Sequence, residues 1–273
     1  VMPDYMTPLA FIMVRILGAL VLFLLVSTLF FNLKVARRDL LRLFACGAFG
    51  VAINQMLFFL GLNLTEPINA AIIMTSNPIL VLIMASIILG EVIKWRRVLG
   101  IVLGLAGALF LILYQNSNGG INLDYSSGDV LVFLNASSYA VYLVLVKPLM
   151  SKYPPIVVIT WVFLFGSMVA APFCFPAFLT IDWLAMPSHV LWAVAFVVLG
   201  TTFLAYLLNT FALRELSPST VSIYIYTQPV LASVVAIGLG KDQFDVVKMV
   251  SALLIFTGVY LVSNRRLLKR KVD

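Results

Sequence analysis

The chain has 273 residues, of which 63% are apolar and only 11% are charged. A mean hydropathy of +1.10, spread along the whole length, excludes a soluble enzyme with one anchor and equally excludes a disordered protein. The net charge of +7 would suggest nucleic acid in a soluble protein, but the basic residues lie in short groups between apolar runs, as in cytosolic loops. We therefore expect a protein whose entire chain is a membrane domain, with no nucleic-acid partner.

Nine apolar runs are long enough to cross a hydrocarbon core of about 30 Å as helices. They lie at 8–30, 43–62, 68–89, 97–114, 129–149, 156–179, 190–213, 218–239 and 246–263. A β-barrel would show shorter segments that alternate polar and apolar residues, whereas FLLVSTLFF is apolar on every face. The sequence predicts an all-α polytopic membrane protein.

The second half of the chain repeats the first at a shift of 151 residues. This shift pairs Pro67 with Pro218 and Pro78 with Pro229, so that two helices each begin with a proline and contain another eleven residues later. The counterpart of the helix at 129–149 would lie before residue 1, and the chain begins with valine, so we expect a fragment of a parent with ten helices in two fives. The expected organisation is a first repeat without its first helix at 1–114, an outward-facing linker at 115–128, a second repeat at 129–263 and a basic cytosolic tail at 264–273.

The basic residues predict the orientation of the chain. Fifteen of the eighteen lysines and arginines, including those of the tail, map to one side of this arrangement. The positive-inside rule then places the C-terminus in the cytosol and the helices in the cytoplasmic membrane. Because five helices per repeat put matched loops on opposite sides, we expect an inverted-topology repeat, which is typical of transport by alternating access.

Several motifs resemble a known family. The run NQMLFFLGLNLTEPINAAIIMTSNPILVLIMASIILGE resembles the first repeat of EamA-like proteins in the drug/metabolite transporter superfamily, and GTTFLAYLLNTFALRELSPSTVSIYIYTQPVLA resembles the second. The resemblance covers essentially the whole chain. It implies a fold of five plus five helices and the export of small metabolites such as amino acids.

Pro78 and Pro229 lie about 16 Å into their helices, close to the midplane of a bilayer. Each proline lacks an N–H group and so leaves a carbonyl, that of Met74 or Ile225, without its helical donor. Paired interruptions of this kind predict a hinge at a binding site. The alternative is that proline is simply frequent in membrane helices.

Polar and aromatic side chains recur at helical spacing on several helices and predict a substrate cavity. The candidate lining residues are Asn54, Asn77, Asn135, Tyr139, Tyr142, Thr202, Tyr206, Asn209, Tyr224 and Gln228. Hydrogen bonding between helices is the alternative role for the same residues. A further candidate, Arg15, lies about 10 Å below the outer surface, where a charge is costly unless it contacts substrate or snorkels to the interface.

The sequence gives little support for an enzyme, a metal site or a cofactor. Cys46 and Cys174 lie in apolar runs, and the only histidine, His189, has no paired ligand. The expected partners are a small-molecule substrate and the lipid bilayer. A scaffold that does not transport and a channel-like facilitator remain the alternative functions.

Overall fold

The computed structural model describes residues 5–115, 126–240, 243 and 245–263. Within these ranges the chain forms helices and no strands, and nine stretches are long and apolar enough to span a membrane. The predicted all-α polytopic class is therefore confirmed. The predicted tail at 264–273 lies outside the described residues, as does the predicted linker at 115–128 except for its two ends.

Five of the spans in the described part are uninterrupted α-helices. They are α1 (Pro8–Phe30), α6 (Trp95–Gln115), α7 (Ser127–Met150), α8 (Pro155–Leu179) and α13 (Val246–Ser263). A proline suits the first position of α1 and α8, because the N–H group at that position has no partner within the helix. At the start of α7, the Ser126 hydroxyl accepts a bond from the Gly128 amide at 3.1 Å, and Asp129 accepts one from the Ser126 amide at 2.9 Å.

The other four spans change their helical geometry part-way across. Two of them contain a wide π-helical turn. The first consists of α2 (Arg37–Gly47), η1 (Ala48–Ala52) and α3 (Ile53–Leu64), and the second consists of α9 (Ser188–Phe196), η2 (Val197–Leu204) and α10 (Ala205–Glu215). The other two are broken ahead of a proline. The first consists of α4 (Pro67–Met74) and α5 (Asn77–Leu89), and the second consists of α11 (Pro218–Ile223), the 3₁₀ turn η3 (Tyr224–Tyr226) and α12 (Thr227–Gly238).

These irregularities recur in the two halves at the shift seen in the sequence. The spans at 37–64 and 188–215 have bounds 151 residues apart, and each contains the π-helical turn. The two broken spans meet at their breaks, where the Tyr226 hydroxyl donates to the Thr75 carbonyl at 2.9 Å, and these two residues are also 151 apart. The two halves therefore share one pattern of helix irregularities.

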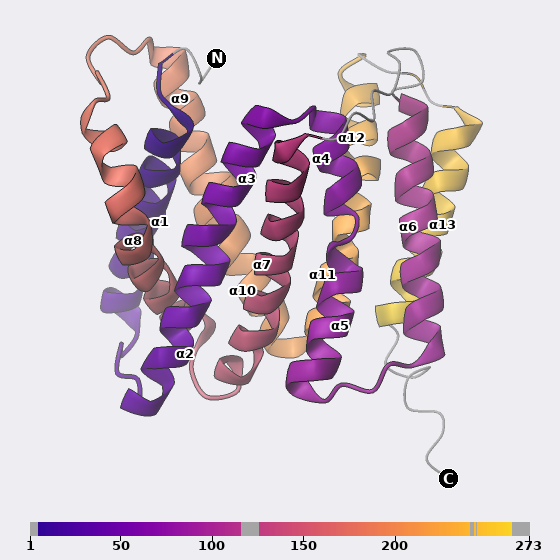
Figure 1. Ribbon diagram of the computed structural model, residues 1–273, viewed down its shortest axis with the longest axis horizontal. Helices are drawn as coiled ribbons and strands as arrows, with labels where there is room; N and C mark the ends of the chain where they lie inside the picture. Colours follow the sequence, from indigo (N-terminus) through magenta and orange to yellow (C-terminus); the bar gives the residue numbers. More distant parts are fainter. Residues whose placement is uncertain (1–4, 116–125, 241–242, 244, 264–273) are drawn as a thin grey trace.

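The spans pack side by side in an elongated bundle (Figure 1). At one end α1 packs on α8, in the middle α3 and α5 pack against α7, and at the other end α6 pairs with α13. The largest buried core joins α1, α2, α7 and α8, and a smaller one joins α6, η3 and α13.

The contact between α6 and α13 depends on glycines. A Cβ atom at Gly258 would lie 2.4 Å from the Gly100 carbonyl oxygen, and one at Gly107 would lie 2.8 Å from the Ser251 carbonyl oxygen. Only glycine allows the backbones to approach so closely. The glycines of α6 therefore form a small-residue packing face against α13.

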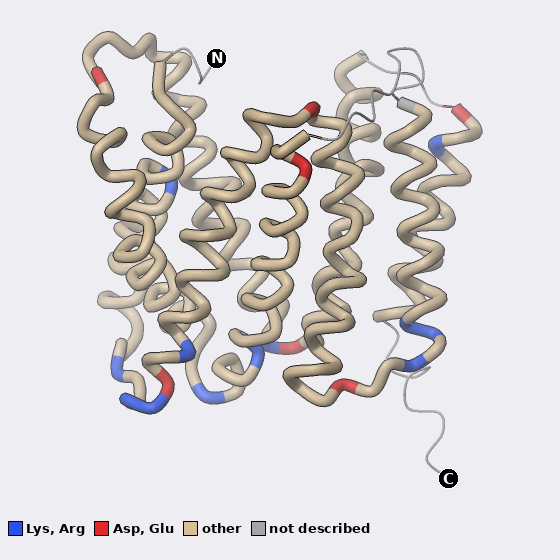
Figure 2. Tube along the Cα trace, in the orientation of Figure 1, with Lys and Arg blue, Asp and Glu red and all other residues tan. Residues whose placement is uncertain are grey.

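Charged residues gather at the two ends of the bundle (Figure 2). Lysines and arginines concentrate at the end where α2 and α6 begin, drawn at the bottom of the view. Helix α2 begins at Arg37, six residues before the sequence-based boundary of 43, because this polar segment also supports a helix. Its Asp39 accepts bonds from Lys152 and Tyr153, both at 2.8 Å, and so fixes α2 to the turn between α7 and α8.

Candidate functional site

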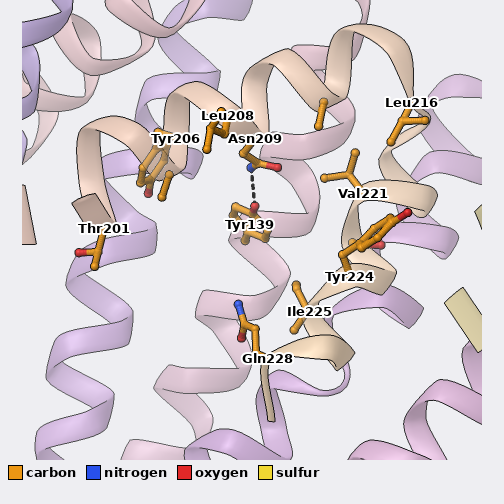
Figure 3. A pocket seen from close by; sticks show the side chains of 13 residues that line it. Tyr139, Thr201, Tyr206, Leu208, Asn209, Leu216, Val221, Tyr224, Ile225 and Gln228 are labelled. Atoms are coloured by element: carbon orange, nitrogen blue, oxygen red, sulfur yellow. Dashed lines mark hydrogen bonds between the residues drawn. The ribbon is translucent and has the colours of Figure 1, made fainter. Parts of the chain in front are cut away.

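A cavity of about 540 Å³ opens between α7, α10 and the broken span of α11 and α12 (Figure 3). We call it the polar cavity. It is lined by Tyr139, Thr201, Ala205, Tyr206, Leu208, Asn209, Ala212, Leu216, Val221, Ser222, Tyr224, Ile225 and Gln228. None of these described lining residues carries a charge, so the cavity suits a neutral part of a ligand.

Two hydrogen-bonded groups define the polar wall of this cavity. The Asn209 side-chain amide donates to the Tyr139 hydroxyl at 2.7 Å, and the Tyr206 hydroxyl donates to the Gly50 carbonyl at 3.1 Å. Gln228 reaches the same space from α12, as Figure 3 shows. Tyr224 lies at another edge, with its hydroxyl 3.5 Å from that of Ser263. The cavity thus offers hydroxyl and amide groups between aromatic rings.

The π-helical turn η2 decides which threonine faces this cavity. A regular helix would align Thr202, Tyr206 and Asn209, whereas the structure places Thr201 in the lining instead. Thr202 is fully buried, donates to the Val197 carbonyl at 2.9 Å and accepts a bond from Arg15. A π-helical turn carries more residues than an α-helical one and so shifts the face that each side chain occupies.

A second cavity, of about 510 Å³, lies between α3, α4, α6 and α12. We call it the apolar cavity. It is lined by Phe58, Leu62, Pro67, Ile68, Ala70, Ala71, Met74, Thr75, Ala108, Ile112, Ile225, Tyr226, Gln228, Pro229 and Ala232. Ile225 and Gln228 line both cavities and therefore stand between them.

The two cavities extend toward opposite ends of the bundle. The polar cavity reaches Leu216, at the turn between α10 and α11, and the apolar cavity reaches Pro67, at the turn between α3 and α4. Figure 1 shows these turns at opposite ends of the molecule. The partition formed by Ile225 and Gln228 lies at the break of the span, next to Pro229.

The three predicted asparagines of α3, α5 and α7 connect helices and do not line the polar cavity. The Asn135 amide donates to the Asn54 carbonyl at 2.7 Å, and the Asn54 amide donates back to the Asn135 carbonyl at 3.4 Å. The Asn77 amide donates to the Ala136 carbonyl at 3.1 Å. These contacts match the alternative role of hydrogen bonding between membrane helices.

Tyr142 also lies away from both cavities. Its side chain is fully buried, and its ring lies where a Cβ atom at Gly50 would be, only 2.4 Å away. Glycine at this position of η1 leaves room for the ring. The tyrosine therefore packs α7 against the π-helical turn.

Arg15 lies inside the protein, next to the polar cavity but not in its lining. Its Nε donates to the Thr202 hydroxyl at 3.0 Å. Its guanidinium lies 5.1 Å from the centre of the Phe59 ring and 5.8 Å from that of Phe11. The charge is thus held between aromatic rings, which attract a cation through their negative faces.

Pro78 and Pro229 stand directly after the two helix breaks. Pro78 is the second residue of α5, and Pro229 is the third of α12. The residues four positions earlier, Met74 and Ile225, both line the apolar cavity. Neither of their carbonyls can receive the usual helical bond, because proline has no N–H to donate. The breaks therefore bring irregular backbone to the partition between the cavities.

Sequence periodicity did not identify several lining residues. Ser222 and Val221 lie in the short helix α11, and Thr201 takes the place that Thr202 was expected to occupy. The first two follow a proline-initiated turn, and only the tertiary arrangement shows which way they face. The sequence offered one usable signal, Pro229, which lies three residues after the end of η3.

The nine candidate spans of the described residues, with two cavities between their helices, define a multi-pass membrane protein. The chain belongs to the EamA-like transporter family, which it matches over residues 1–113 and 126–264. The family and its relatives are named as transporters, not as enzymes.

Individual relatives extend over most of the chain. The uncharacterized transporter YyaM of Bacillus subtilis (strain 168) is 27% identical over 90% of this chain and 81% of its own. A probable terminal-alkyne amino-acid exporter of Streptantibioticus cattleyicolor is 23% identical over 86% of this chain and 76% of its own. A crystal structure of a protein with 18% identity covers 93% of this chain and 86% of its own with a TM-score of 0.75, which shows the same fold.

Proposed function

We propose that this protein is a secondary transporter that exports small metabolites, amino acids among them, across the cytoplasmic membrane. The observation that carries the proposal is the polar cavity, which lies beside an interrupted helix within the membrane-spanning bundle. Interrupted helices at matching positions of two repeats point to substrate sites in transporters. The relative named as an amino-acid exporter supports this substrate class.

The two cavities support alternating access. They reach opposite ends of the bundle and share Ile225 and Gln228, so a small rearrangement at the break in η3 would connect the ligand with one side or the other. We propose that Pro78 and Pro229 serve as the hinges, and that the halves at 1–114 and 129–263 act as inverted-topology repeats. In this arrangement Tyr139, Tyr206, Asn209, Tyr224 and Gln228 contact the ligand.

The charge distribution supports an orientation. Lysines and arginines gather at the end where α2 and α6 begin, and by the positive-inside rule this end faces the cytosol. Helix α13 ends at the same side, which supports a cytosolic C-terminus. The polar cavity then opens toward the cytosol, where an exporter collects its substrate.

Counterflow in proteoliposomes tests the proposal. Vesicles loaded with single unlabelled amino acids should accumulate the corresponding labelled one, and Gln228→Leu should reduce this accumulation about tenfold or more, because a polar ligand group loses its partner in a dry site. Thr257→Val is the matched control, because the Thr257 hydroxyl bonds only to the Leu253 carbonyl of its own helix on an exposed face. Absence of counterflow for every amino acid, or equal counterflow in Gln228→Leu and wild type, would contradict the proposed site.

A further inference from the structure

The guanidinium of Arg15 is a partly buried positive charge without a negative partner in the described part of the chain. Ion pairs that join Arg97 to Glu91, Lys152 to Asp39 and Lys248 to Asp245 all lie near the ends of the bundle. Charged side chains within a membrane are costly and usually pair with a counter-charge or serve a substrate. The only hydrogen bond that Arg15 makes within the described residues uses Nε and leaves the two terminal nitrogens available.

The antiparallel packing of α1 and α3 places an amide opposite this charge. Phe11 and Phe59 meet edge to face, with ring centres 5.5 Å apart, and form one layer. Arg15 follows Phe11 by one turn on α1, and Gln55 precedes Phe59 by one turn on the antiparallel α3, so the two form the next layer. The register of the two helices therefore directs Arg15 and Gln55 toward the same space.

Gln55 is itself incompletely satisfied. Its side chain is 3% exposed, and neither its nitrogen nor its oxygen has a hydrogen-bond partner of standard geometry. The Tyr206 phenol lies close enough to interact with both the Gln55 amide and Arg15. A buried amide without partners is costly, and a ligand that supplies an acceptor would remove this cost.

Tyr206 connects this cluster with the polar cavity. It lies one turn after Thr202, the acceptor of the Arg15 bond, and it also lines the polar cavity. A ligand whose neutral part occupies that cavity can therefore extend past the Tyr206 ring to Arg15 and Gln55.

We infer that Arg15 and Gln55 form a carboxylate subsite at the edge of the polar cavity. Tyr206 lies between this subsite and the cavity. This inference rests on the proposed function and narrows the substrates to molecules that carry a carboxylate next to a neutral, partly apolar body. The free terminal nitrogens of Arg15 bind the two carboxylate oxygens side by side, a geometry that a guanidinium provides and an ammonium does not. The Gln55 amide nitrogen donates a further bond.

Ligand pairs that differ only at the carboxyl group test the subsite. The probes are L-phenylalanine with L-phenylalaninamide, and benzoate with benzamide, at millimolar concentrations. Their apparent Kd values are measured by thermal shift on the purified full chain. In wild type the acid of each pair should bind about tenfold or more tightly than its amide, because its bonds to Arg15 are charge-assisted.

Three variants and a control separate the subsite from other effects. Arg15→Gln and Arg15→Lys should lose most of the acid-over-amide preference, and Gln55→Leu should lose part of it with Arg15 still in place. Arg42→Gln, an exposed arginine of α2, should keep the preference. If Arg15→Gln does not fold, Gln55→Leu and the wild-type comparison decide the outcome.

Equal binding of acid and amide by wild type, no response to either acid, or an unchanged preference in Gln55→Leu and Arg15→Gln would overturn the inference. Counterflow distinguishes this failure from failure of the proposed function. Transport of a neutral solute that requires Gln228 but tolerates Arg15→Gln would leave the transporter standing and remove the carboxylate subsite.

Discussion

At the scale of single residues, the same chemical group serves two purposes in this membrane domain. Asn135 and Asn54 use their amides to bond one helix to the other, whereas Asn209 directs its amide to a tyrosine at a cavity wall. A buried amide needs partners in either case, because an amide that gives up its hydrogen bonds to water and gains none in the protein lowers the stability of the fold. What distinguishes the residues is whether the partner is a helix backbone or a group that a ligand can replace.

The pair formed by Tyr139 and Asn209 gives a prediction at this scale. Tyr139→Phe removes the hydroxyl that accepts the Asn209 amide at 2.7 Å and should lower the free energy of unfolding by about 0.5–1.5 kcal/mol. It should also weaken ligand binding, because the freed amide is no longer held in place. Thermal unfolding and counterflow measure both effects.

Tyr260→Phe is the control for this exchange, because Tyr260 is 59% exposed on α13. If the two phenylalanine variants unfold and transport alike, the hydrogen bond between Tyr139 and Asn209 has no role in the site.

At the scale of helices, close approach and interruption are the features that shape the molecule. Gly258→Ala would place a methyl group 2.4 Å from the Gly100 carbonyl oxygen and should cost about 1–3 kcal/mol, since neither backbone can give way without moving a helix. Thermal unfolding in detergent measures this loss. Gly238→Ala is the matched control, because no heavy atom lies within 4 Å of a Cβ atom there, and it should leave stability unchanged or slightly higher.

The break in η3 gives a second prediction for the helices. Pro229→Ala restores an N–H that can bond to the Ile225 carbonyl and so extend α12 back through the 3₁₀ turn. We expect a protein at least as stable as wild type whose counterflow is several-fold slower, because the hinge is stiffer.

Pro172→Ala provides the comparison, since Pro172 lies within the regular helix α8, away from both cavities. A Pro229→Ala variant that transports at the wild-type rate would show that the break is only a packing feature.

The sequence predicts most of the helices and the breaks near Pro78 and Pro229, but not the two π-helical turns. Spans such as Pro8–Phe30 follow from the apolar length that a bilayer demands, and proline marks where several of them begin. The π-helical turns cannot be predicted in this way, because they depend on tertiary contacts. Examples are the Tyr142 ring against Gly50 and the bond from the Tyr206 hydroxyl to the Gly50 carbonyl. For this reason regular spacing assigns Thr202, and not Thr201, to the cavity.

At the scale of the whole molecule, the two ends of the bundle differ in charge, and this asymmetry predicts its orientation. After replacement of the buried Cys46 and Cys174, single cysteines at Ser151 and Ala185 would stand at opposite, exposed ends. A maleimide that does not cross membranes should label Ala185→Cys on intact cells and label Ser151→Cys only after permeabilisation. The reverse pattern would invert the proposed direction of transport.

The bond from the Tyr226 hydroxyl to the Thr75 carbonyl joins matched positions of the two halves. If the halves exchange their roles as the protein opens to one side and then the other, this contact has the same surroundings in both conformations. An interaction shifts an equilibrium only by the amount that it differs between the two states. Loss of the hydroxyl in Tyr226→Phe would therefore leave their relative populations as they were, and it would speed their interconversion if the bond opens on the way from one to the other.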